Sequence, residues 1–233
     1  MPAAHHSDFK NHVSVNIDKA SFRGFSSSLG VANFLGVPFA TISERFRLAQ
    51  LVKPASLSGT VDVTNYGPKC PQPENFGRRR RLHIYEGVPE SVVSTSELDC
   101  LRLNIYTPSA SISSATCSKL PVLVYIHGGG WVFGDGNSEY GECLQPSVLV
   151  TALKNVQIDG NFLVHESVNQ QRPFLFVTLN YRLGYLGFLH SQELRSEAKR
   201  NNEEYCPNLG LHDQRLALQW VIYLLSRKAR HIG

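Results

Sequence analysis

The chain has 233 residues, a hydrophobic fraction of 42% and a formal net charge of +4, values typical of one globular domain. The mild basic excess does not predict a nucleic-acid partner, and no apolar run reaches the roughly 18 residues that would predict a membrane span. The first residues lack the apolar core of a secretory signal, and the five cysteines are an odd number, so we expect a cytoplasmic, reducing location.

Strand signals dominate the first part of the chain, and strands and helices alternate later. We expect residues 1–12 to form a disordered tail and the Ser-rich stretch 109–118 to form a loop. A helix should begin near Asp213, an acid suited to its N-cap or first turn, with Leu216, Leu218, Val221, Ile222 and Leu225 on its apolar face. Strands are predicted at 13–17, 31–40, 101–106, 120–126 and 174–180. This alternation favours an α/β fold.

The most informative stretch is His127-Gly128-Gly129-Gly130-Trp131, which directly follows the apolar run 120–126. The β-branched run predicts a strand buried on both faces. Consecutive glycines allow positive φ and leave backbone N–H groups unshielded, and donors fixed in advance can stabilise a developing oxyanion. His-Gly-Gly-Gly after a strand is the oxyanion-loop motif of esterases and lipases with the α/β-hydrolase fold. A plain Gly-rich turn is the alternative.

An oxyanion loop attacks nothing by itself. Its partner in these enzymes is a serine in a G-x-S-x-G turn between a strand and a helix. No such pentad occurs in the 233 residues, and the nearest approach, Gly136-Asn137-Ser138-Glu139-Tyr140, lacks the final glycine. We therefore assign no catalytic nucleophile, acid or base, and no metal or cofactor.

Four segments, in order, carry a family resemblance. They are NFLGVPFA at 33–40 with Arg45-Phe46, LDCLRLNIYTP at 98–108, PVLVYIHGGGWVFG at 121–134, and NYRLGYLGFL at 180–189 followed by NLGLHDQRLALQWV at 208–221. Together they resemble the N-terminal part of the type-B carboxylesterases, the cholinesterase-like branch of the α/β-hydrolases. The resemblance implies a mixed, mostly parallel sheet with a small antiparallel N-terminal sheet.

The resemblance also implies roles for particular residues. Gly129 and Gly130 would supply oxyanion-hole amides, with His127 and Gly128 shaping the turn. Cys70 and Cys100 match a family disulfide, although two free thiols in a cytosolic chain are an equal alternative. Arg182 and Asp213 match a buried ion pair that is structural rather than catalytic.

The same resemblance divides the chain and indicates a function. A partial carboxylesterase domain would span 13–221, with an atypical insertion near 142–159 and a divergent end at 222–233. The function expected is hydrolysis of small-molecule carboxylic esters in a full-length form, with this chain truncated before the nucleophile and inactive. The alternatives are a non-enzymatic binding module and a regulatory fragment that pairs with a full-length esterase.

Overall fold

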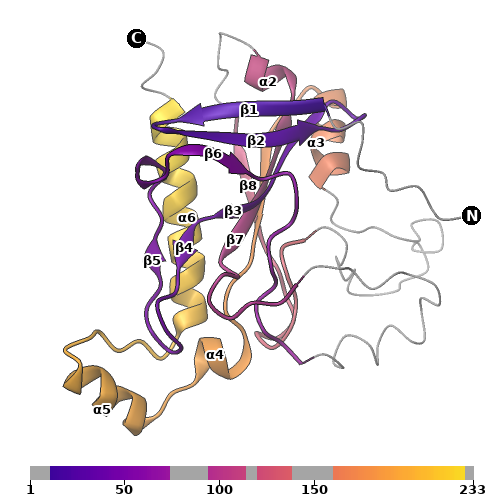
Figure 1. The fold of residues 1–233 in the computed structure, drawn as a ribbon. Coiled ribbons are helices and arrows are strands. Elements are labelled where there is room, and N and C mark those ends of the chain that lie inside the picture. The colour runs from indigo at the N-terminus through magenta and orange to yellow at the C-terminus, as the bar shows by residue number, and fades with distance from the viewer. Residues whose placement is uncertain (1–10, 74–93, 114–119, 138–159, 229–233) are drawn as a thin grey trace, which may run out of the picture.

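The computed structural model describes residues 11–73, 94–113, 120–137 and 160–228 of the chain. Within these ranges the main sheet has seven strands (Figure 1). In spatial order they are β1 (Asn11–Ile17), β2 (Ala20–Ser26), β3 (Val31–Pro38), β7 (Arg102–Pro108), β9 (Leu175–Leu179) and β8 (Val122–Ile126), with β6 (Gly59–Asp62) beside β2.

The sheet is mixed in strand direction. β1, β2, β3, β7 and β9 pair antiparallel in turn, whereas β6 pairs parallel with β2 and β8 pairs parallel with β9. A separate antiparallel pair joins β4 (Ala40–Thr41) to β5 (Gln50–Leu51). The predicted α/β class, with a mixed sheet and a small antiparallel sheet, is confirmed. In the described ranges the sheet is less parallel than expected, because four of its six strand pairings are antiparallel.

Helices gather in the second half of the described chain. The longest is α6, and α3 lies on the crossover between the parallel strands β8 and β9. Their bounds are α2 (Ala110–Ser113), α3 (Gly160–Asn169), α4 (Gly184–Phe188), α5 (Gln192–Arg200) and α6 (Leu209–Lys228), and a 3-10 turn spans Pro54–Ser56.

Helices α3 and α6 cover opposite faces of the sheet (Figure 1). Successive strand residues point to opposite faces, so the two sides can be separated by parity. On β7, Ile105 packs in the core cluster that contains Trp220 of α6, whereas Tyr106 packs in the cluster that contains Val164 of α3. The resulting three layers bury the centre of the sheet on both faces and leave β8 as an edge strand in the described residues.

Four local expectations are corrected. β8 is only partly buried, and Leu123 is 49% exposed, because β9 is its one described neighbour. The Ser-rich stretch contains the short helix α2, while 114–119 lie outside the described residues. β1 begins at Asn11, inside the expected tail. Helix α6 begins at Leu209, so Asp213 is neither its N-cap nor in its first turn.

The apolar face expected for α6 is divided between two sides of the helix. Leu216 and Val221 are buried against the sheet, whereas Leu218, Ile222 and Leu225 are exposed and lie with Leu211 on the opposite side. A helix that is apolar on two sides is typical of a helix packed between layers. Helix α6 also continues through 222–228, part of the end that was expected to diverge.

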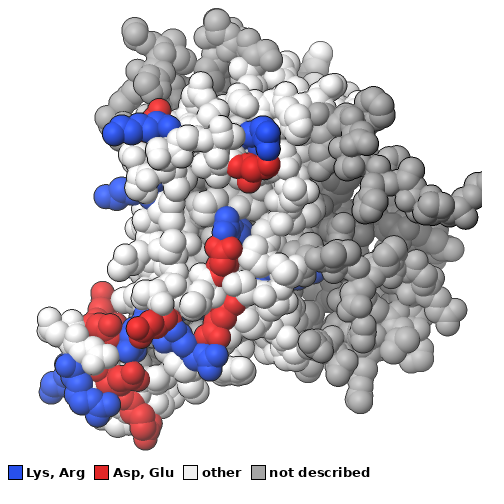
Figure 2. All heavy atoms as spheres, in the orientation of Figure 1, with Lys and Arg blue, Asp and Glu red and all other residues white. Residues whose placement is uncertain are grey.

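Charged side chains on the face shown in Figure 2 gather mainly around α5, and both signs are interspersed there. Arg47 connects this region to the body of the protein. Its guanidinium lies 3.1 Å from Glu197 of α5 and 2.8 Å from Glu203, and its side chain is 13% exposed. Ser191 caps α5 by accepting a hydrogen bond from the Leu194 amide.

Candidate active site

The glycine-rich segment lies at the carboxyl ends of the two parallel strands. β8 ends at Ile126 and leads directly into His127, while β9 ends at Leu179, opposite Ile126 in the register, and leads into Asn180. In α/β sheets, ligands bind in the crevice outside the carboxyl ends of parallel strands. The topology therefore places residues 127–136, which we call the glycine loop, where a substrate would be expected.

The front of this loop adopts a left-handed backbone. The φ angles are +115° at Gly129, +61° at Gly130 and +61° at Trp131. A Cβ on Gly129 would lie 1.8 Å from the carbonyl oxygen of Phe133, so no other residue fits there without a rearrangement. Gly128 differs, because its φ is not in the left-handed region and a Cβ would meet nothing within 4 Å.

The amides of Gly129 and Gly130 remain available. Among the described residues neither N–H donates a hydrogen bond, whereas the carbonyl of Gly129 accepts from the Val132 and Phe133 amides at 3.1 and 3.3 Å. The loop thus uses its acceptor to close a turn and leaves two neighbouring donors uncommitted. An oxyanion hole requires donors of this kind.

His127 anchors the start of the loop. It is 6% exposed, and its ring stacks on Tyr181 with the centroids 4.4 Å apart. Its Nδ1 donates to the Gly128 carbonyl at 2.8 Å, and the Tyr181 hydroxyl donates to the His127 carbonyl at 3.0 Å. Burial is the main cause that lowers the pKa of the imidazole. His127 is therefore neutral at pH 7 and acts as a packed support.

The rear of the loop is fixed by polar side chains, two from strands β7 and β9 and two from segments outside the strands. The Gly136 amide donates to Asn180 Oδ1 at 2.7 Å. The Gly136 carbonyl accepts from Asn104 Nδ2 at 2.9 Å and from the Thr178 hydroxyl. The Gly134 amide donates to Gln72 Oε1 at 2.9 Å. The sequence analysis missed these residues, although the polar Asn104 and Thr178 within apolar strand patterns are a signal that could have indicated them.

Arg182 and Asp213 form a buried ion pair beneath the site. Their side chains are 2% and 0% exposed. Arg182 donates from Nε to Oδ2 at 2.8 Å and from Nη2 to Oδ1 at 2.7 Å, and its backbone amide also donates to Oδ2 at 3.1 Å. The remaining guanidinium nitrogen donates to the Arg47 carbonyl at 2.7 Å. The pair therefore ties the segment after β9 to helix α6.

Cys70 and Cys100 are joined by a disulfide with their Cα atoms 4.9 Å apart, and both are buried. Cys100 lies just before β7, and Cys70 lies two residues before Gln72, which contacts the glycine loop. Ser138, the serine nearest to an elbow pattern, and the expected insertion at 142–159 lie outside the described residues.

Other kinds of site have less support. The described residues contain no group of three His, Cys, Asp or Glu side chains that could hold a metal ion. None of the helices in the described ranges combines the length and apolar character that crossing a bilayer needs.

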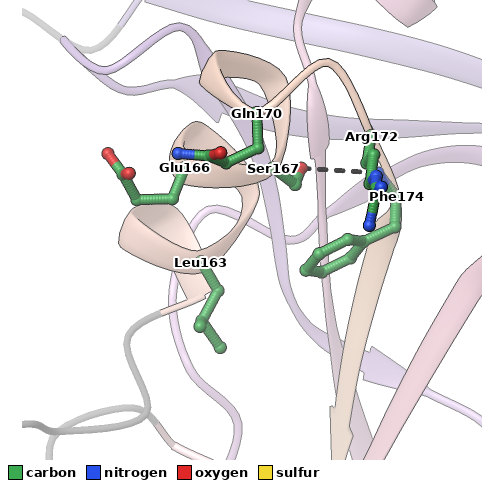
Figure 3. A pocket seen from close by; sticks show the side chains of 6 residues that line it. All are labelled: Leu163, Glu166, Ser167, Gln170, Arg172 and Phe174. Atoms are coloured by element: carbon green, nitrogen blue, oxygen red, sulfur yellow. Dashed lines mark hydrogen bonds between the residues drawn. The ribbon is translucent and has the colours of Figure 1, made fainter.

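An open hollow of about 710 Å³ lies beside α3 (Figure 3). Its lining includes Arg172 and Phe174, just before β9, so it opens at the amino ends of the parallel strands, opposite the glycine loop.

Comparisons with known proteins agree with this architecture. A secreted lipase of Arthroderma benhamiae is 34% identical over 195 residues, covering 82% of this chain and 28% of the lipase. A para-nitrobenzyl esterase of Bacillus subtilis is also 34% identical over 195 residues, covering 82% of this chain and 31% of the esterase. The chain thus spans less than a third of the length of these relatives. Because the first of them is named as secreted, the expected cytoplasmic location gains no support.

Solved structures of esterases also match this chain. EstA of Aspergillus niger matches with a TM-score of 0.62 and 29% identity, covering 93% of this chain and 33% of EstA. The juvenile hormone esterase of Manduca sexta matches with a TM-score of 0.61 and 27% identity, covering 91% and 32%. A model of the carboxylesterase family matches residues 11–225, beyond both ends of the domain expected at 13–221. This chain belongs to the carboxylesterase family.

Proposed function

We propose that this chain carries the oxyanion-binding part of a serine-type carboxylic-ester hydrolase. The observation that carries the proposal is the pair of uncommitted amides on Gly129 and Gly130 at the carboxyl end of β8. Attack on an ester carbonyl turns its oxygen into an oxyanion, and two preorganised N–H donors stabilise that charge in the transition state. The names of the relatives, lipase and para-nitrobenzyl esterase, support a carboxylic ester as the substrate class.

The nucleophile would have to come from elsewhere, because the 233 residues contain no G-x-S-x-G pentad. Without it no acyl-enzyme can form, and an oxyanion hole alone contributes only weak catalysis. The isolated 233-residue chain should therefore hydrolyse short 4-nitrophenyl esters no faster than an unrelated basic protein. It should also show no labelling by a fluorophosphonate probe. Stoichiometric phosphonylation of one serine would overturn this part of the proposal.

A chimera tests the oxyanion role directly. Residues 11–225 of this chain would replace the matching segment of the Bacillus subtilis para-nitrobenzyl esterase, which retains its own remaining two thirds. We expect hydrolysis of 4-nitrophenyl acetate, and a fall in kcat of about 10²-fold or more with Gly129→Ala, because the added Cβ displaces the donors.

The control for this chimera is Gly30→Ala. Gly30 also has a left-handed φ, +71°, but it lies in the turn between β2 and β3. This variant should lose stability and keep kcat. A folded chimera with the same kcat with and without Gly129→Ala would contradict the proposed role of the glycine loop.

A further inference from the structure

One side chain bonds both backbone groups of a single residue in the glycine loop. Gln72 accepts at Oε1 from the Gly134 amide at 2.9 Å and donates from Nε2 to the Gly134 carbonyl at 3.0 Å. This is the pairing that a neighbouring strand would make, here supplied by a side-chain amide. Gln72 lies 62 positions from Gly134 in the sequence, so the contact joins two remote segments.

A second contact joins the same two segments. Lys69 Nζ lies 3.0 Å from Asp135 Oδ2, and the two side chains are 16% and 6% exposed. At this burial the pair is shielded from solvent far better than a surface salt bridge. Residues 68–72, which we call the clamp segment, therefore hold two consecutive residues at the rear of the glycine loop.

The clamp segment is itself held firmly. The Lys69 amide donates to the Ser94 carbonyl at 2.8 Å, and the Ser96 amide donates to the Lys69 carbonyl at 3.0 Å. Cys70 is bonded to Cys100. A segment fixed by backbone pairing and a covalent bond can impose its position on the loop that it contacts.

A displacement of Gly134 would also displace residues at the front of the loop. Gly134 has a φ of +118°, and a Cβ on it would lie 2.4 Å from His127 Nδ1 and 2.6 Å from the Gly128 carbonyl. Its neighbour Phe133 leaves no room for a Cβ on Gly129. The rear of the loop is therefore in direct van der Waals contact with the residues that present the uncommitted amides.

We propose that Gln72 is a positioning residue for the oxyanion-binding amides. By bonding both backbone groups of Gly134, it fixes the direction in which the Gly129 and Gly130 N–H groups point, and the Lys69–Asp135 pair secures the same register. The inference rests on the proposed function only in assuming that these amides bind an oxyanion.

The test is carried out on the 15N-labelled 233-residue chain with Gln72→Glu. At neutral pH the new carboxylate still accepts from the Gly134 amide but repels the Gly134 carbonyl, which lost its donor. We expect the Gly129 and Gly130 amide signals to shift, because the backbone that orients them moves. Protonating the carboxyl near pH 4 restores a donor, so the signals should return toward those of the unmodified chain at the same pH.

Controls separate positioning from general damage. Gln219→Glu makes the same change on the exposed side of α6 and should leave the loop signals unchanged. Comparison at matched pH cancels the contributions of the other charged and titratable groups near the pair, which are His127, Asp135 and Lys69. Gln72→Ala should displace the same signals at neutral pH with no recovery in acid, which covers the case in which the Gln72→Glu chain unfolds.

The two proposals fail in distinguishable ways. If Gln72→Glu and Gln72→Ala both leave the Gly129 and Gly130 signals as in Gln219→Glu, the positioning role is wrong, whatever the chimera hydrolyses. If the signals move as expected and the chimera with Gly129→Ala keeps its activity, the positioning role stands and the oxyanion role falls.

Discussion

The front and the rear of the glycine loop are built in opposite ways. At the front, Gly129 and Gly130 have left-handed backbones and amides without an acceptor among the described residues. At the rear, the backbone groups of Gly134 and Gly136 are paired with four side chains from three other segments of the chain. The front resembles a binding surface, whereas the rear resembles a core.

The difference teaches where preorganisation comes from. A donor without a protein acceptor keeps a fixed direction only if something else holds its backbone in place, since a free loop would reorient the N–H. Here the polar contacts at the rear and the buried Arg182–Asp213 pair provide that support. Perturbing the support should therefore cost more stability than perturbing the front, and the predictions run in that order.

The largest loss of stability is expected on changing Arg182 or Asp213. Either Arg182→Met or Asp213→Asn should reduce the free energy of unfolding by about 3–5 kcal/mol, because each leaves an unpaired buried group. Urea denaturation of the two single variants and the double variant would give the coupling energy. The matched control is the Arg23–Asp62 pair, whose side chains are 45% and 49% exposed, where each change should cost about 1 kcal/mol or less. A cycle without coupling would refute the buried pair.

The second largest loss of stability is expected on opening the disulfide that anchors the clamp segment. Cys70 and Cys100 are separated by 30 positions, and opening a loop of this size should cost about 3–4 kcal/mol in the chain-entropy model. The midpoint of urea unfolding should fall when dithiothreitol is added. The Cys70→Ser/Cys100→Ser variant should already have the lower midpoint and should not respond to the reductant. Equal midpoints for the oxidised and reduced chains would show that the clamp segment does not depend on the bridge.

The third largest loss of stability is expected at Gly129 and not at its neighbour Gly128, at the front of the loop. Gly129→Ala should cost about 2 kcal/mol, because its φ is left-handed and the new methyl group meets the Phe133 carbonyl. Gly128→Ala should change stability by no more than about 0.5 kcal/mol, because the site is open and its φ is ordinary. Thermal melts of the two variants compare them directly. Equal losses would mean that the loop backbone differs from the one described.

Sequence reasoning located most of the fold and one part of the site. Alternation and apolar runs found β1, β3, β7, β8 and β9, because the period of a strand is a local property. The exposure of β8 and of one side of α6 was missed, since burial depends on which elements are neighbours and not on the element itself. The glycine motif located the front of the loop, because consecutive glycines permit the left-handed backbone found there.

The rear of the loop could not be predicted. Gln72, Lys69 and Asp135 have ordinary neighbours in the sequence, and they meet only because the clamp segment and the glycine loop are brought together by the fold. Their contacts also depend on the Cys70–Cys100 disulfide, which holds the clamp segment. The resemblance suggested that disulfide, but two free thiols were an equal alternative. The Arg182–Asp213 pair was also suggested by resemblance alone, and Asp213 lies inside α6 rather than at its start.

The smallest effect concerns His127, which joins the front to the rear. Burial lowers its pKa in the folded chain below the ordinary value of 6.5, so the unfolded chain binds a proton first as the pH falls. Stability should therefore be constant with respect to this group above about pH 7 and should decrease below about pH 6.5, until the folded imidazole also becomes protonated. The measurement is the slope of the free energy of unfolding between pH 7.5 and pH 5.5, values chosen on the order of one unit either side of the ordinary pKa. His127→Gln should flatten this slope, whatever it does to stability at a single pH, whereas His12→Gln at an exposed position of β1 should leave it as it is. If the slope persists in His127→Gln, the acid sensitivity arises elsewhere, and His127 is not the neutral support that connects the two ends of the loop.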